Sequence, residues 1–134
     1  MTACYGIRPH EIVECEFDDE YNLEICENTK TGFRVVWPCH EYWIQTFNLK
    51  NIHKPTQGKA TVQHAANQAL QQRGPLPWTL YNLRHAYAVR LFHKGVPSNV
   101  AAELMGHSEQ VHRRDYKRWY NKRAITSLRS QYNT

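Results

Sequence analysis

The regular spacing of apolar side chains is clearest between Leu80 and Lys94. At about 100° per residue, one side of this segment forms a continuous apolar arc, made of Leu80, Leu83, Tyr87, Ala88, Leu91 and Phe92. Thr79, which follows the Pro-Leu-Pro of residues 75–77, is a suitable N-cap, and Gly95 is a candidate left-handed C-cap. The pattern therefore predicts a helix that buries one face.

Other segments predict further helices and one hairpin. Helical patterns occupy residues 41–49, 60–72, 96–106 and 121–132, and a short one with Ile7, Ile12 and Val13 follows Gly6. The runs NLEICEN (22–28) and FRVVWP (33–38) are β-like and are joined by TKTG. Gly32 can take the positive φ of a tight turn there, which would put Lys30 at or near the hairpin tip.

The last predicted helix, residues 121–132, carries only a thin apolar strip of Ala124, Ile125 and Leu128. A strip this thin fits two arrangements, one in which the helix packs on its own domain and one in which it packs on a neighbouring molecule.

These elements predict an α+β fold that is mostly helical, with a small antiparallel hairpin or sheet beside a helical bundle. With 134 residues, the segment 1–134 is expected to form a single domain with its own core. No apolar run is long enough to span a membrane and no signal segment is present, so we expect a cytoplasmic protein without a membrane partner.

The four cysteines are Cys4, Cys15, Cys26 and Cys39, which lie 11 to 13 residues apart without a C-x-x-C pair. This spacing is not typical of zinc sites, and we expect free buried thiols.

Charge is distributed unevenly along the chain. Residues 1–57 contain five Lys or Arg against nine Asp or Glu, a net charge of −4, whereas residues 58–134 contain twelve against three, a net charge of +9. A compact domain with this asymmetry is expected to have one basic face, which is typical of proteins that bind polyanions. A positive surface that serves only solubility is the alternative.

Arg84 lies near the middle of the apolar arc between Leu80 and Lys94. A guanidinium that points into a core is costly unless it is paired or hydrogen-bonded. One interpretation is a buried ion pair with Glu11 or Glu14. The other is that the arc borders a cleft in which the arginine binds an external anion.

Two further segments carry candidate chemistry. Gly106 ends one predicted helix and Ser108 can cap the next, so His107 lies in a turn between two helices, where functional side chains are often presented. Tyr116 lies within RRDYKRW, a basic helix whose weak apolar face would let it move. Tyr116 is a candidate nucleophile, and Arg113, Arg114, Lys117 and Arg118 are candidate DNA-binding residues. Packing or stacking of Tyr116, and a carbonyl bond from His107, are the alternatives.

If the anion is a phosphodiester, cleavage without a metal requires a nucleophile, charge stabilisation and a proton for the leaving oxygen. Arginine suits the second task because its fork can donate two parallel bonds to a phosphate. Arg8, just beyond the turn at Gly6, could clamp the phosphate together with Arg84, and Lys30 could supply the proton.

These motifs, in this order, resemble the catalytic domain of the tyrosine recombinases, the phage-integrase family. YGIRPHEI resembles the first arginine box and supplies Arg8, and NTKTGFRVVWP resembles the β-hairpin segment and supplies Lys30. The segment from YNLRHAY to RRDY resembles the second box and supplies Arg84, His107 and Tyr116.

The resemblance implies a mechanism and partners. Tyr116 would attack a phosphate to form a 3′-phosphotyrosyl link, Arg8, Arg84 and His107 would hold the non-bridging oxygens, and Lys30 would protonate the leaving 5′ oxygen. A 5′-hydroxyl from another strand would reverse the step, without a metal or any other cofactor. The implied partner is double-stranded DNA, with tetramers assembled on it and the C-terminal helix passed to a neighbour. No small-molecule substrate is implied.

The chain departs from the family pattern in two places. Tyr81 occupies the position where the family usually has a histidine, three residues before the second arginine. A tyrosine there can bond a phosphate oxygen but cannot act as a base at neutral pH. Family members also usually carry an N-terminal core-binding domain, and their catalytic domain begins one or two helices before Arg8. We therefore expect residues 1–134 to be a single catalytic domain that lacks its first helices and the N-terminal core-binding domain.

Three other functions compete with recombination. A truncated relative could bind DNA without cutting it, and a type IB topoisomerase would use similar chemistry. A metal enzyme built on the eight histidines is the third, but the chain has no H-E-x-x-H or comparable pairing.

Overall fold

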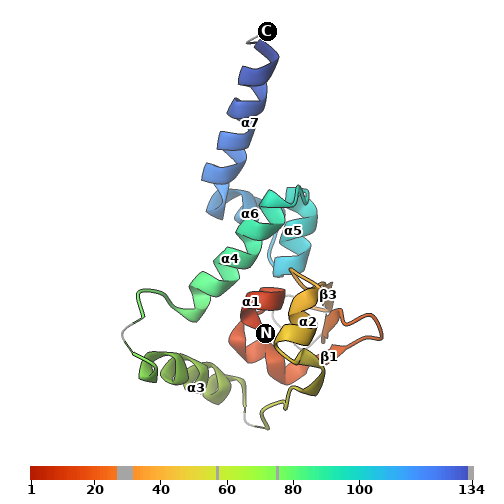
Figure 1. The fold of residues 1–134 in the computed structure, drawn as a ribbon, viewed down its shortest axis with the longest axis vertical. Helices are drawn as coiled ribbons and strands as arrows, with labels where there is room; N and C mark the ends of the chain where they lie inside the picture. The colour runs from red at the N-terminus through yellow and green to blue at the C-terminus, as the bar shows by residue number, and fades with distance from the viewer. Residues whose placement is uncertain (27–31, 57, 75, 133–134) are drawn as a thin grey trace.

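The computed structural model describes residues 1–26, 32–56, 58–74 and 76–132. Figure 1 shows its helices and its three-stranded sheet. In chain order the elements are α1 (Thr2–Tyr5), the 3-10 helix η1 (Pro9–Glu14), β1 (Cys15–Phe17), β2 (Leu23–Ile25), β3 (Arg34–Val36), α2 (Tyr42–Thr46), the 3-10 helix η2 (Leu49–Asn51), α3 (Lys59–Gln72), α4 (Leu80–His93), α5 (Ser98–Met105), α6 (Glu109–Asp115) and α7 (Lys117–Tyr132). The predicted α+β class, mostly helical, is confirmed.

The sheet is antiparallel in the order β1-β2-β3. In the middle of the three strands, Glu16 pairs with Glu24 and Glu24 pairs with Val35. These three side chains lie on the outer face of the sheet. The flanking positions, such as Leu23 and Val36, are fully buried, as the period of two requires. The pairing of β2 with β3 confirms the predicted hairpin, whereas β1 was not predicted. Residues 27–31, which contain Lys30, lie outside the described residues.

Helix α4 begins and ends almost where the sequence predicted. The backbone N–H of Thr79 donates to Asn82 Oδ1 at 2.7 Å, and Gly95 has a φ of 78° just beyond the C-cap. The segment predicted as one helix over residues 41–49 is divided into α2 and η2. Asn48 adopts a φ of 50° between them, and this left-handed conformation interrupts the helix.

The core lies where α1, the sheet, α4 and α5 meet. Its fully buried members are Tyr5, Ile7, Leu23, Ile25, Val36, Tyr87, Leu91 and Ala101, with Met105 at 1% exposure. Three of the cysteines, Cys4, Cys15 and Cys39, are buried free thiols as predicted. Cys26 is also free but is exposed, because it lies just beyond the end of β2.

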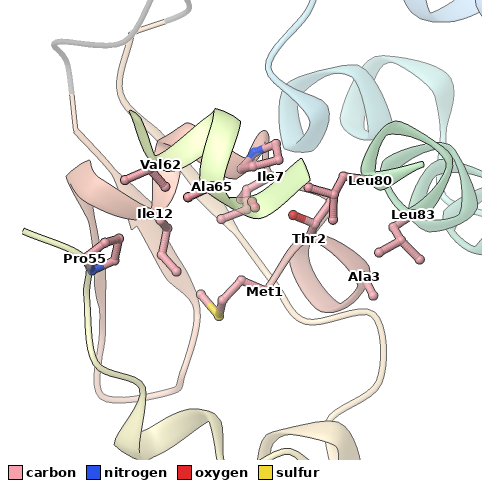
Figure 2. Close-up of a pocket in the computed structure, with 12 residues that line it drawn as sticks. Met1, Thr2, Ala3, Ile7, Ile12, Pro55, Val62, Ala65, Leu80 and Leu83 are labelled. Atoms are coloured by element: carbon pink, nitrogen blue, oxygen red, sulfur yellow. The ribbon is translucent and has the colours of Figure 1, made fainter. Parts of the chain in front are cut away.

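An apolar cavity of about 520 Å³ lies among α1, η1, α3 and α4 (Figure 2). Figure 2 shows Met1, Ile12, Val62 and Leu80 around this cavity. Leu80 and Leu83, which begin the apolar arc of α4, line it and remain partly exposed. Helix α3 contacts both η1 and α4.

The last helix extends away from the rest of the molecule (Figure 1). No described residue of α7 is buried, and Ile125 and Leu128 are 68% and 51% exposed. The apolar strip of the terminal helix therefore does not pack on its own domain. None of the described helices is both long enough and apolar enough to cross a membrane.

Candidate functional site

Two glycine turns frame the candidate site. Gly6 follows α1 with a φ of 64°, and Gly106 follows α5 with a φ of 69°. A Cβ atom at Gly6 would lie 2.3 Å from Tyr87 Cδ1, and one at Gly106 would lie 2.6 Å from Arg34 Cζ. Both turns therefore require glycine for conformation and for close approach.

Arg84 of α4 links these two turns, which present Arg8 and His107. Its Nη1 donates to the carbonyl oxygen of Gly6, and its Nη2 donates to that of Met105. Arg84 is only 5% exposed. Burial, with the nearby charge of Arg8, lowers its pKa to about 10, so it stays charged at neutral pH. Backbone carbonyls, rather than a carboxylate, thus satisfy the arginine.

The buried acid of the site is Glu11, which is 1% exposed. Its Oε2 accepts from Arg34 Nη2 at 2.8 Å, and its Oε1 accepts from Arg8 Nη1 at 3.0 Å. Burial alone would raise the pKa of Glu11, but the hydrogen bond and charge of Arg34, together with Arg8, lower it. Glu14, the other acid considered as an arginine partner, pairs with Lys59 at 2.7 Å.

Arg34 is a site residue that the sequence reading missed. Its Nη1 and Nη2 donate to Glu11 at 3.0 and 2.8 Å, and its Nε donates to the carbonyl of Leu104 at 3.2 Å. The available signal was the alternation in β3. Arg34 shares the buried side of the strand with Val36, while Phe33 and Val35 are exposed. A charge at a buried strand position indicates a pairing partner.

His107 belongs to a short chain of polar rings. Its Nε2 lies 2.8 Å from His112 Nδ1, and His112 Nε2 lies 3.2 Å from Tyr120 Oη. Burial, with the charges of His112, Arg84 and Arg8, lowers the pKa of His107 to about 4. His107 is therefore neutral at neutral pH. Across the described ranges, no group of three or more His, Cys, Asp or Glu side chains could hold a metal ion.

Tyr116 forms the C-cap of α6 and is 4% exposed. Its Oη lies 2.7 Å from Nδ1 of His85, on α4. Its ring is tilted against His112 with the centroids 4.7 Å apart. The expectation of a loosely held helix is therefore wrong, because His112 and Tyr116 anchor α6 in the core.

The electrostatics of Tyr116 also differ from the expectation. Burial raises the pKa of its phenol above the ordinary value, and Arg84 is the cation that opposes this shift. The cations of RRDYKRW were expected to activate the phenol. Arg113, Arg114, Lys117 and Arg118 are instead all exposed. Arg113 pairs with Glu109 at 3.0 Å, and Arg114 pairs with Asp115 at 3.2 Å.

A cleft of about 460 Å³ opens between η1, α3 and α4, with polar groups on several sides. Arg8, Arg84 and Tyr81 line it together, and α3 contributes the amides of Gln63, Asn67 and Gln71. Tyr81 is 60% exposed and lies edge-on to His85, with the ring centroids 4.5 Å apart. His107 lines a smaller cavity of about 230 Å³ that it shares with Arg34 and Gly106.

The structure therefore brings four of the six predicted catalytic residues close together and places a fifth beside them. Arg8, Arg84 and His107 meet around the glycine turns, and Arg84 also acts on Tyr116. Tyr81 lies at the cleft, next to His85. Lys30 is outside the described residues.

The chain is similar to two proteins of Nostoc sp. strain PCC 7120. It is 34% identical to Excisase A over 142 residues, which cover 90% of this chain and 30% of that protein. It is 32% identical to Excisase C over 140 residues, which cover 90% of this chain and 28% of that protein. The chain thus spans less than a third of the length of these relatives. No family model matches it. No solved structure matches it either.

Proposed function

We propose that this chain is part of an enzyme that breaks and rejoins duplex DNA through a covalent link between a DNA phosphate and Tyr116. The observation that carries the proposal is the convergence on Arg84. This buried arginine bonds the turns that present Arg8 and His107, and its charge acts on Tyr116. The similarity to two excisases over 90% of the chain supports a role in DNA excision and recombination.

Each of these residues has a task in the proposed reaction. Tyr116 Oη attacks the phosphorus, and the bond between phosphorus and the 5′ oxygen breaks. Arg8 and Arg84 stabilise the charge on the non-bridging oxygens, and neutral His107 donates one further hydrogen bond. Lys30 protonates the leaving oxygen. Attack by a 5′-hydroxyl then returns the phosphate to DNA and frees the tyrosine.

The cleft supports an anionic polymer as the substrate. Arg8 is partly exposed, with 32% of its side chain accessible, and it lines the cleft together with Arg84. The guanidinium of Arg84 carries more N–H groups than its two carbonyl bonds use, so a phosphate can bind without displacing them. The exposed cations of α6 and α7 extend the positive surface along which DNA would lie.

The test is the formation of a covalent adduct. The wild-type chain would be incubated with a pool of nicked duplexes, without added metal, and resolved on a denaturing gel. Wild type is expected to give a shifted band that disappears in Tyr116→Phe. Tyr120→Phe is the matched control, because this neighbouring tyrosine also bonds a histidine but should keep the adduct. A band that survives in Tyr116→Phe would refute the assignment of the nucleophile.

A DNA-binding protein that does not cut is the second candidate. It is favoured by the burial of Tyr116, whose raised pKa disfavours attack, and by Tyr81 at the position where a histidine is expected. It predicts salt-sensitive DNA binding by wild type and Tyr116→Phe alike, with no covalent adduct from either.

The first proposal, strand cleavage by Tyr116, also includes the assembly of several copies of the chain on DNA through α7.

A further inference from the structure

We propose that His85 is the general base that takes the proton from Tyr116 in the strand-cleavage step. The inference rests on the proposed function, because it assigns a role within that reaction. It starts from one contact between two helices that α5 separates in the chain. Nδ1 of His85, on α4, lies 2.7 Å from the hydroxyl oxygen of Tyr116, at the end of α6.

The buried phenol needs a partner that accepts its proton. Burial raises the pKa of Tyr116, so very little phenolate exists at neutral pH without help. A neutral imidazole within hydrogen-bond reach can remove the proton while the oxygen attacks. The observed distance meets that geometric requirement before DNA binds.

The other candidate bases in this part of the site are less suitable. His107 and His112 are bonded to each other at 2.8 Å, and His112 also contacts Tyr120. Tyr81 is exposed, and a phenol is not a proton acceptor suited to this task. Tyr81 instead packs edge-on against the His85 ring, one helical turn away. Among the described residues, His85 is the histidine whose ring nitrogen lies within hydrogen-bond distance of the Tyr116 hydroxyl.

Both positively and negatively charged side chains lie near the His85–Tyr116 pair. The titratable groups that contact this pair or act on the phenol are Tyr81 and Arg84 from α4, and His112, Asp115 and Tyr120 from α6 and α7. Arg84 favours the phenolate, whereas Asp115 opposes it. Because Tyr116 Oη must approach the phosphorus to attack it, the positive charge that forms on His85 arises next to the phosphate, whose negative charge stabilises it.

The proton balance of the step is simple. The phenol proton moves to Nδ1 of His85, the oxygen forms a bond to phosphorus, and the 5′ oxygen leaves with a proton from the general acid. In the return step, protonated His85 gives the proton back to the tyrosine oxygen as the phosphotyrosyl bond breaks. The mechanism requires Nδ1 to carry the lone pair in the resting protein, with the proton on Nε2.

The kinetic test compares His85→Ala with His85→Gln. Single-turnover adduct formation on nicked duplexes would be followed between about pH 5 and pH 9. General-base catalysis typically contributes about 10²–10⁴-fold, so both variants should lose a factor in this range at neutral pH. Added imidazole should restore part of the rate in His85→Ala. A glutamine can hold the tyrosine but cannot accept its proton, so a near-wild-type rate in His85→Gln would overturn the proposal.

A second measurement does not depend on turnover. In the wild-type chain, the ¹⁵N spectrum of His85 should show Nδ1 unprotonated, and its resonance should move in Tyr116→Phe. A His85 tautomer with the proton on Nδ1 would overturn the proposal, since the phenol would then be the acceptor. If wild type forms no adduct on any duplex, the proposed function fails. The tautomer then still decides whether the His85–Tyr116 bond has the required direction.

Discussion

At the scale of single residues, Glu11 is the buried acid that connects two arginines of the site. It joins Arg34, which is buried, to Arg8, which lines the cleft. Glu11→Gln would remove the negative charge that Arg34 binds. Breaking a buried pair in this way typically costs about 3–5 kcal/mol, which urea unfolding would measure. Glu14→Gln is the matched control. Its pair with Lys59 is partly exposed, so a change of about 1 kcal/mol or less is expected.

The pH dependence of stability follows from the same residue. The pKa of Glu11 is lowered in the folded chain, so the folded state binds the proton less tightly than the unfolded state does. Its contribution is therefore fully present above the ordinary glutamate pKa of about 4.3. That contribution should be lost as the pH falls from there through the lowered pKa. Urea midpoints measured from pH 7 down to pH 3 should show a smaller acid loss in Glu11→Gln than in wild type.

Alanine variants at two glycines can separate the cost of the left-handed backbone from the cost of a steric clash. Gly6 and Gly95 have similar positive φ values, of 64° and 78°. A Cβ atom at Gly6 would meet the Tyr87 ring at 2.3 Å, whereas one at Gly95 would have nothing within 4 Å. Both alanine variants lose about 1–2 kcal/mol from the left-handed backbone.

Gly6→Ala should lose more than Gly95→Ala and should also weaken DNA binding, because the shifted turn would move Arg8. Thermal unfolding and a binding titration at fixed salt would measure the two effects. Equal losses of stability in the two variants would show that the close packing of Gly6 against Tyr87 contributes little.

At the scale of elements, the sequence predicted helices better than it predicted their contacts. The period of α4 and its caps at Thr79 and Gly95 are local features, and they were found within a residue. The alternation of Cys15, Glu16 and Phe17 is also local but too short to distinguish from the preceding helical turn, so β1 was missed.

The partners of the charged residues were harder to predict. Arg84 was expected either to pair with Glu11 or Glu14 or to bind an external anion. Its partners within the chain are instead carbonyls of two turns that lie about 100 residues apart. The contact between His85 and Tyr116 likewise depends on how α4 crosses α6, which no local pattern reports. Sequence spacing identified most of the candidate residues, whereas the fold determined which of them meet.

Helix α7 carries the prediction that belongs to this scale. Its apolar side chains Ile125 and Leu128 are exposed, although they share one side of the helix. Replacing both with aspartate should change the free energy of unfolding by less than about 0.5 kcal/mol, because neither packs on its own domain. If α7 docks on a neighbour, the same change should abolish assembly on DNA.

Sedimentation velocity with and without a duplex would measure this assembly. Ser130→Asp, on the side of α7 opposite Ile125 and Leu128, is the control for added negative charge and should leave assembly intact. Unchanged assembly of the Ile125 and Leu128 variant would show that this strip is not the contact between copies.

At the scale of the whole molecule, the charge asymmetry of the sequence becomes an arrangement in space. The acidic segment forms α1, the sheet and α2 at one end, and the basic segment includes α4 to α7, which lead to the other end (Figure 1). A duplex is therefore expected to approach from the side of α4, α6 and α7. The acidic sheet face, with Glu16 and Glu24 paired across strands, would repel it.

This orientation predicts which cations contribute to DNA affinity. Each contact between a cation and a phosphate contributes about one unit to the slope of log affinity against log salt concentration. Lys117→Ala should therefore reduce the slope by about one. Arg113→Ala should reduce it by less, because Arg113 must first exchange its bond with Glu109 for a phosphate. Fluorescence anisotropy over a range of salt concentrations would measure the slopes.

Two control variants test whether DNA binds to the proposed face of the molecule. Lys50→Ala removes a cation from the acidic end, where Lys50 lies over the Tyr21 ring, and should leave the slope unchanged. Tyr116→Phe should also leave it unchanged, since the phenol is buried and the role we propose for it is in chemistry and not in affinity. An effect of Lys50→Ala as large as that of Lys117→Ala would place DNA on a different face. The arrangement of Arg8, Arg84 and Tyr116 would then have to be reached from that side.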